Sequence, residues 1–216
     1  MIEILYKDKY ILVCRKLAGL LCEGEGKDAL PTLLSEQLKS EGERGDIFPV
    51  HRLDRETEGV VVYARSSSAA SALSAQITNG EWRKIYNAWL CGKPEKESDR
   101  LCDLLYYDRR LSKSFVVERE RKGVKSAVLD YEIIASSPDG KRTLVKIELG
   151  TGRTHQIRVQ FASRGLPLCA DRRYGAPKDS GASLALAAVS LDIKHPKTNQ
   201  PMHFEIEPKN LEEYKY

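Results

Sequence analysis

The hydrophobic pattern along the chain consists mainly of short apolar runs separated by polar turns. These runs are rich in β-branched and aromatic residues or alternate with polar ones, which is typical of strands. The predicted strands are residues 4–6, 10–13, 60–64, 82–90, 129–136, 143–149, 184–193 and 202–206. Two turns, Lys7-Asp8-Lys9 and Ser137-Pro138-Asp139-Gly140, join neighbouring runs, so we expect a hairpin at each of them.

Three longer segments carry apolar residues at three- to four-residue spacing, which predicts amphipathic helices. They are residues 28–40, 66–79 and 155–164. Pro31 suits the first turn of the first helix, and serines at the start of the second offer an N-cap. Thr154 is placed to cap the third helix, which Gly165 ends. With no internal repeat and no low-complexity segment, the pattern predicts an α+β fold.

Length and composition bound the class of protein. At 216 residues the chain can bury a sizeable core, as one domain or as two closely fused halves. A hydrophobic content of 41% and a charged content of 31% are those of a soluble globular protein. No apolar run reaches the roughly 18 residues that a membrane helix needs, and Met1–Asp8 has no signal-peptide pattern. We therefore expect a cytoplasmic protein.

The five cysteines and four histidines do not have the spacing of a metal site. No two cysteines form a Cys-x-x-Cys, and no two histidines lie four residues apart. Reduced thiols that act as small apolar core residues fit this pattern better. The sequence therefore predicts reduced cysteines and no bound metal.

The distribution of positive charge is more informative than its total. The formal net charge is +4 and the pI about 8.7, below the value above 9 that marks a strongly basic nucleic-acid-binding domain. Glu118–Lys122 is predicted to be an ordinary solvated face. Other cations are better candidates for phosphate contacts: Arg52 with Arg55, Arg83-Lys84, Arg109-Arg110, Arg153 with Arg158, and Arg172-Arg173.

The stretch His51–Gly59 carries the clearest candidate chemistry. Asp54 lies between two arginines, Arg52 and Arg55, with a turn-forming glycine close behind. The apolar run that follows reads as a buried strand, so Asp54 is placed on a connection into the core, where a side chain can be aimed. The two arginines favour the ionised carboxylate, which suits a nucleophile. A structural Asp–Arg pair on a loop is the alternative for such a short motif.

The string HRLDRETEG resembles the signature of the RluA-type pseudouridine synthases, with Asp54 at the position of the catalytic aspartate. Four further blocks resemble later signatures of that family and occur in the same order: Arg83–Tyr86, Gly152–Arg158, Leu168–Gly175 and His195–Thr198. The resemblance covers nearly the whole chain. It implies a single catalytic domain over residues 1–216, with a mixed, mostly antiparallel sheet, flanking helices and a central cleft. Because the catalytic pattern begins within ten residues of the start, we expect no S4 RNA-binding domain.

The reaction that this resemblance implies is isomerisation of uridine to pseudouridine within structured RNA, either rRNA or tRNA. The N1–C1′ bond breaks, the uracil turns and a C5–C1′ bond forms. The atoms balance without a redox change, so neither a cofactor nor a metal is expected. A stacked uridine must first leave its stack, which costs a few kcal/mol. We expect RNA to be the partner, with no membrane, and the protein to be a monomer.

The resemblance also assigns roles to residues. Asp54 is the nucleophile, attacking C1′ or C6 or assisting glycal formation, and Arg158 is the arginine that pairs with it. Tyr86 stacks on the uracil and helps to remove the C5 proton. The predicted substrate-binding residues are His51, Arg52, Arg55, Arg153, Thr154, His155 and Arg172. Arg52 is a candidate for filling the gap left by the extruded base, although a simple pairing with Asp54 is equally compatible with the sequence.

Two residues depart from the family pattern. Leu17 replaces a proline in a loop, and Glu58 occupies a position that is usually serine. We expect Glu58 either to repel an RNA phosphate or to point to solvent on the turn. Two other functions remain as alternatives: an RNA-binding or ribosome-assembly module without catalysis, and a glycosidase. The intact aspartate, tyrosine and arginine argue against the first, and the lack of a clear second acid for a glycosidase pair in the motif blocks argues against the other.

Overall fold

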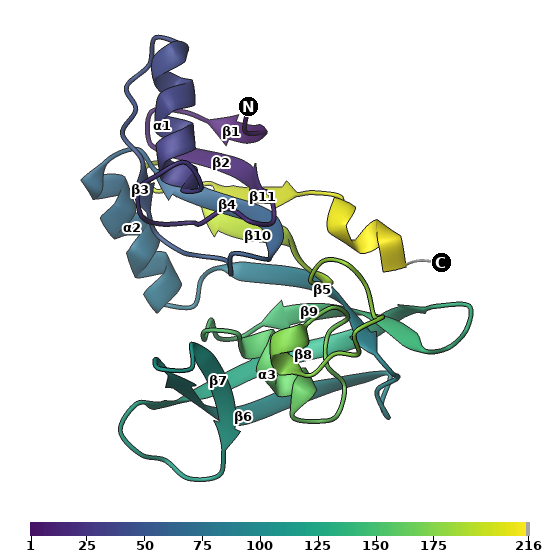
Figure 1. Cartoon of the computed structure of the whole chain (residues 1–216). Helices are drawn as coiled ribbons and strands as arrows, with labels where there is room; N and C mark the ends of the chain where they lie inside the picture. The colour runs from purple at the N-terminus through teal and green to yellow at the C-terminus, as the bar shows by residue number, and fades with distance from the viewer. Residues whose placement is uncertain (215–216) are drawn as a thin grey trace. The chain divides into compact units, whose positions relative to one another are not determined.

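The computed structural model describes residues 1–214 and divides the chain into two compact units. Unit 1 consists of Met1–Lys84 and Ala188–Pro208, and unit 2 consists of Ile85–Ala187 and the residues from Lys209 onward. The chain therefore passes from one unit to the other near the start of the strand β5 (Arg83–Cys91), within the strand β10 (Leu186–Lys194) and again after Pro208. Figure 1 shows the elements of both units in chain order.

Unit 1 is built on a sheet with two helices. Its strands follow the order β1-β2-β4-β10, with β11 paired to β10 and β3 paired to β4. The remaining bounds are β1 Ile4–Lys7, β2 Ile11–Lys16, β3 Phe48–Pro49, β4 Glu58–Ala64 and β11 Pro201–Glu205; the helices are α1 Leu30–Ser40 and α2 Ser67–Thr78. The pairs β1–β2, β2–β4 and β10–β11 are antiparallel. Every residue of β2 and β4 is buried, because these strands lie inside the sheet.

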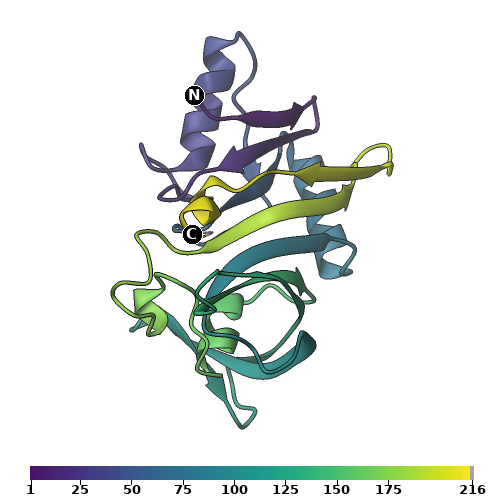
Figure 2. The same cartoon turned by 90° about the vertical axis from the view of Figure 1, so that its right-hand side faces the viewer.

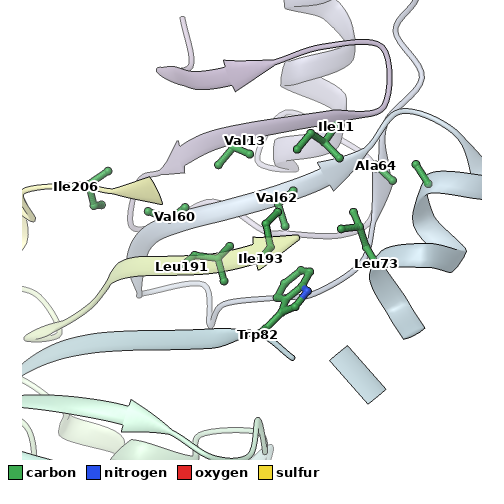
Figure 3. Packing of buried hydrophobic residues seen from close by; sticks show 11 residues of the cluster. Ile11, Val13, Val60, Val62, Ala64, Leu73, Trp82, Leu191, Ile193 and Ile206 are labelled. Atoms are coloured by element: carbon green, nitrogen blue, oxygen red, sulfur yellow. The ribbon is translucent and has the colours of Figure 1, made fainter. Parts of the chain in front are cut away.

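The core of unit 1 forms between the sheet and α2. Val13 of β2, Val62 of β4 and Leu191 of β10 belong to one cluster with Leu73 of α2 and Trp82 (Figure 3). Fully burying an aliphatic side chain of this size stabilises a fold by about 1.5–3 kcal/mol. The β-branched residues that predict strands in the sequence are therefore also the residues that join the strands to the helix.

Unit 2 is an antiparallel sheet that curves around one short helix. Its strand order is β5-β9-β8-β6-β7, with β6 Ser98–Asp108, β7 Lys113–Val117, β8 Val124–Ser136 and β9 Arg142–Leu149. The helix α3, Gln156–Ala162, is enclosed by the curving strands (Figure 2). Two 3-10 helices complete the unit, η1 Arg172–Tyr174 and η2 Lys209–Tyr214. Val159 and Leu105 belong to the cluster that joins α3 to the sheet.

The α+β prediction and most of the predicted elements are confirmed. Pro31 lies in the first turn of α1, and Ser66 caps α2 by accepting a hydrogen bond from the backbone of Ala69 at 3.2 Å. The strands β6 and β7 were not predicted. Apolar and polar residues do not alternate regularly along them: Leu104 and Leu105 are adjacent in β6, and in β7 Ser114 is buried while Phe115 is exposed. In the described residues, no helix is long and apolar enough to cross a membrane.

The predicted Thr154 cap of the third helix is wrong. The helix begins at Gln156 and its N-cap is His155, which has left-handed backbone geometry with φ 53° and makes no capping hydrogen bond. The Gln156 side chain ties down the preceding loop instead, because its Oε1 accepts from the Arg153 backbone at 3.0 Å and from Thr151 at 2.7 Å. Sequence signals for helix starts are sought in the residue that precedes the helix. Gln156 lies inside the first turn, so its role was not predicted.

Candidate active site

In unit 1, Asp54 lies on the connection between β3 and β4. The Asp54 carbonyl accepts a hydrogen bond from the Thr57 backbone at 3.0 Å, which closes a turn just before β4. The neighbouring Leu53 is buried, and its backbone donates to the thiol of Cys22 at 3.2 Å. The Asp54 side chain is half-buried. The backbone that carries the Asp54 carboxylate is therefore fixed just before β4 begins.

Lys16, at the end of β2, fixes the same loop from inside. It is fully buried, and its ammonium donates to the carbonyls of Leu17, Arg55 and Thr57 at 3.2, 3.0 and 2.7 Å. Desolvation lowers the pKa of Lys16 to about 8, and nearby carboxylates, including that of Asp54, oppose part of this shift. Sequence reasoning missed this role, because a lysine that follows an apolar strand has no local signal of burial.

Glu58 does not point to solvent, so that expectation for it was wrong, whereas the alternative of repulsion near an RNA phosphate stays a prediction. Glu58 is the first residue of β4, is buried, and binds the buried Arg15 of the adjacent β2 through that residue's Nε at 2.7 Å. Gly59 is likewise part of β4 rather than of a turn, and a Cβ there would lie 2.4 Å from the Cβ of Ala188. The strand begins two residues earlier than predicted because a paired glutamate can be buried.

The two arginines that flank Asp54 are exposed and contact the loop that follows β2. Arg52 lies 2.5 Å from Glu23, and Arg55 lies 3.2 Å from Asp28. The Arg55 Nε also donates to the carbonyl of Gly19 at 2.9 Å. More than half of each arginine side chain is accessible, so exchanging these carboxylates for other anions costs little.

His51 has a structural position in the same unit. Its Nε2 accepts a hydrogen bond from the backbone of Val62 at 3.0 Å, and its ring packs edge-on against Trp82 at 5.0 Å. Desolvation, assisted by the charge of Lys84, lowers the pKa of His51 to about 3. The imidazole is therefore neutral at physiological pH and anchors the segment to β4.

In unit 2, Tyr86 lies on β5 and is 8% exposed. It is directly opposite Ile147 of β9, which is in turn opposite Tyr131 of β8. Tyr86 and Tyr131 thus flank the same core residue from the two neighbouring strands. The strand pairing therefore holds Tyr86 at the edge of the buried core of unit 2.

Arg158, on α3, forms a buried charge pair with Asp171. The Nε and Nη2 atoms donate to the two carboxylate oxygens of Asp171 at 2.7 and 2.8 Å, and neither side chain is more than 3% exposed. The guanidinium carbon also lies 5.3 Å from the ring centre of Tyr174. Sequence reasoning missed Asp171 as a functional candidate, although its place in the block Leu168–Gly175 offered a signal.

The other predicted residues of unit 2 surround this pair or lie at the surface. His155 Nδ1 is 3.0 Å from the hydroxyl of Tyr174, so His155 and Arg158 share one aromatic neighbour. Arg153 donates from Nε to the carbonyl of Ser126 at 2.9 Å. The carbonyl of Thr154 accepts from Ser114 at 2.5 Å, and Arg172 is exposed on η1.

The predicted site residues therefore fall into two groups, each described within its own unit. Unit 1 holds His51, Arg52, Asp54 and Arg55, and unit 2 holds Tyr86, Arg153, Thr154, His155, Arg158 and Arg172. Within residues 1–214 no three side chains of histidine, cysteine, aspartate or glutamate are grouped to hold a metal ion. All five cysteines are free thiols, as the sequence predicts.

Comparisons with known proteins agree with the motif blocks. The family RNA pseudouridylate synthase matches residues 10–163. The dual-specificity RNA pseudouridine synthase RluA of Yersinia pestis is 33% identical over 215 residues, which cover 94% of this chain and 98% of the relative. YhcT of Bacillus subtilis, an uncharacterized RNA pseudouridine synthase, is 31% identical; the match covers 92% of this chain and 66% of YhcT. The solved human RNA pseudouridylate synthase domain containing 1 has the same fold, with a TM-score of 0.80, 19% identity and coverage of 99% and 86%.

The chain belongs to the RNA pseudouridylate synthase family, and within it to the RluA type. Members of this family isomerise uridine to pseudouridine within RNA, so the protein is an RNA-modifying enzyme and RNA is its substrate. The fold and function that the motif resemblance implied are thus confirmed.

Proposed function

We propose that the protein isomerises a uridine in structured rRNA or tRNA with Asp54 as the nucleophile. The observation that carries this assignment is the position of Asp54 within the family signature, on a loop whose backbone is fixed by the buried Lys16. A preorganised loop holds a carboxylate in the geometry of attack without further ordering. The relatives act on RNA by name, and rRNA and tRNA are both structured RNAs in which the target base must be extruded.

In the proposed reaction the Asp54 carboxylate attacks C1′ or C6 of the uridine, or assists glycal formation, while the N1–C1′ bond breaks. The released uracil turns, and C5 forms the new bond to C1′. The C5 proton must then leave and N1 must gain a proton, so the reaction is an isomerisation without redox change. The ring of Tyr86 stacks on the uracil, and its hydroxyl assists the removal of the C5 proton. Arg158 stabilises the charge of the catalytic carboxylate.

The remaining site residues bind the RNA in this proposal. Arg52 and Arg55 are exposed, and their present partners are carboxylates, so an RNA phosphate can replace Glu23 or Asp28. Arg52 also fills the gap that the extruded base leaves. Arg172 offers an exposed cation, while Arg153, Thr154 and His155 shape the start of α3. For His51 the geometry favours an anchoring role within this binding segment.

We further propose a single catalytic domain over the whole chain, acting as a cytoplasmic monomer without cofactor or metal. The family match from residue 10 to residue 163 supports the single domain, because it includes parts of both units. The reaction itself balances without a redox group, and free thiols accord with a reducing compartment.

Asp54→Asn tests the proposal. The amide keeps the shape of the side chain but cannot act as the nucleophile, so turnover of uridine should be lost while RNA affinity and the melting temperature stay close to wild type. Pseudouridine in the substrate RNA is measured chemically after incubation with purified protein. Asp46→Asn, on the exposed segment before β3, is the matched control. More than trace turnover by Asp54→Asn would refute the nucleophile assignment. RNA binding without turnover by the wild type would favour the RNA-binding module.

A further inference from the structure

One face of the β6–β7 hairpin carries an aromatic pair that the proposed mechanism does not use. Tyr106 of β6 and Phe115 of β7 are directly opposite each other in the antiparallel register. Leu105 precedes Tyr106 and belongs to the core cluster that includes Val159 of α3. Because successive side chains of a strand point to opposite faces, Tyr106 and Phe115 lie on the face turned away from α3. Opposite residues of such strands have Cβ atoms about 4.5–5.5 Å apart, so the two side chains leave this face from neighbouring positions.

Each ring of this pair has a cation beside it. The guanidinium carbon of Arg121 lies 4.7 Å from the ring centre of Tyr106. The Lys113 ammonium lies 5.7 Å from the ring centre of Phe115 and 4.8 Å from that of Tyr174. Phe115 is 36% exposed, Tyr106 is half-buried, and Arg121 is exposed. We call these four residues the aromatic face. A ring and a cation side by side match the base and phosphate of a single-stranded nucleotide.

The charge of this region favours a polyanionic partner. The segment Asp108–Lys125 carries seven lysine and arginine side chains and three carboxylates. Its excess of four positive charges equals the formal net charge of the entire chain, +4. Local concentration of like charge raises the surface potential and attracts anionic ligands. A cross-strand aromatic pair can also simply stabilise a hairpin, but that role requires no concentration of cations around it.

We propose that the aromatic face is an RNA-binding surface, which stacks unpaired bases of the substrate on Tyr106 and Phe115. Lys113 and Arg121 pair with the phosphates of the same segment. This proposal rests on the proposed function, because it takes RNA as the substrate. The surface requires single-stranded nucleotides, since bases within a duplex do not present their faces. It thereby favours substrates with an unpaired segment in addition to the target uridine.

The test compares a short oligoadenylate with an abasic chain of the same length. Neither ligand contains uridine, so neither has a target for the reaction. Stacking contributes about 1–3 kcal/mol per base, which corresponds to roughly 5- to 150-fold in affinity. Wild type should therefore bind the oligoadenylate at least about fivefold more tightly. The Tyr106→Leu, Phe115→Leu double variant should bind both ligands equally, because leucine keeps an apolar side chain but cannot stack. Arg121→Gln should weaken binding of both ligands and flatten the salt dependence.

Ile134→Ala is the matched control, since Ile134 is an exposed apolar residue of β8, 46% accessible, outside the aromatic face. It should leave the discrimination between the ligands unchanged. The single variant Phe115→Leu, whose side chain is the more exposed, is used if the double variant melts early, and it should lose part of the discrimination. Full discrimination in either leucine variant overturns the proposal. A second outcome also overturns the proposal: light scattering shows that the wild type is a dimer and the double variant a monomer, while both bind the oligoadenylate equally. The aromatic face would then join two copies of the chain.

Turnover separates this proposal from the proposed function. On saturating substrate RNA the double variant should form pseudouridine at the wild-type rate while its KM rises at least about fivefold, because only binding is weakened. Wild type that discriminates between the ligands but converts no uridine would refute the proposed function and leave the aromatic face supported.

Discussion

Arg158 and Asp171 form a two-point charge pair, at 2.7 and 2.8 Å, inside unit 2. A fork of this kind fixes the plane of the guanidinium as well as its position. The family resemblance assigns Arg158 to the catalytic carboxylate. Asp171 therefore sets the position and orientation of the guanidinium that has this role. Breaking a buried pair by removing one charge typically destabilises a protein by 3–5 kcal/mol.

Asp171→Asn should lower kcat by at least about tenfold with little change in KM, because the arginine keeps its place but loses the charge that orients it. The melting temperature should also fall. Asp103→Asn is the control, since Asp103 pairs with the partly exposed Arg164 in the same unit. Steady-state kinetics and thermal unfolding measure both effects. Loss of stability with unchanged kcat in the folded protein would reduce Asp171 to a structural role.

Tyr86→Phe should slow the chemical step by about 100-fold or more while RNA affinity changes little, because the ring remains and only the hydroxyl is removed. Single-turnover kinetics with excess enzyme report the step directly. Tyr131→Phe is a matched control, because Tyr131 faces the same Ile147 from the other side. If both variants react at the wild-type rate, Tyr86 contributes only packing.

Lys16 should make stability depend on alkaline pH. Its pKa is about 8 in the fold and about 10.4 in a model peptide, so the unfolded chain binds more protons between these values. The contribution of Lys16 to stability therefore rises with pH from about 8 to about 10.4, by up to roughly 3 kcal/mol. Denaturant unfolding from pH 7.5 to 10 should show a smaller upward slope for Lys16→Met than for wild type. Lys39→Met, at an exposed position of α1, should retain the wild-type slope.

Glu58→Ser, which introduces the usual residue of the family, should destabilise the protein by about 3–5 kcal/mol, because Arg15 is left buried without its closest carboxylate. Replacing both partners, as Arg15→Leu with Glu58→Leu, should restore much of that loss. Equilibrium unfolding in urea measures the three proteins. A serine variant as stable as wild type would show that the pair contributes little.

RNA affinity should fall steeply with salt, because exposed arginines near the motif blocks contact phosphates. For about five contacts with single-stranded RNA, log K against log salt should have a slope near −3.5. Charge reversal at Arg172 and Arg173 should flatten this slope without changing turnover on saturating substrate. Affinity titrations from low to high salt give the slopes. A salt-independent affinity would mean that stacking and shape hold the RNA.

Much of the fold and of the site could be read from local signals. Alternating and β-branched runs place β2, β4 and β9, because a strand with buried faces needs apolar residues there. The Pro31 and Ser66 signals locate helix starts, since capping depends on neighbours in sequence. The signature around Asp54 identifies the family because it is contiguous. The strands β6 and β7 escaped prediction, since apolar and polar residues do not alternate regularly along them: in β7 Ser114 is buried and Phe115 exposed.

Only the tertiary structure decided which charges are buried and with which partners. Glu58 reads as a solvated turn residue, yet antiparallel pairing of β2 with β4 brings Arg15 beside it and makes burial favourable. Asp171 becomes the partner of Arg158 because the segment that follows α3 brings it back beside the helix. The pairing of Tyr106 with Phe115 likewise depends on the register of two strands. Sequence determined the elements and the reacting residue types, whereas long-range register set their partners, because side chains distant in sequence meet only when the sheet forms.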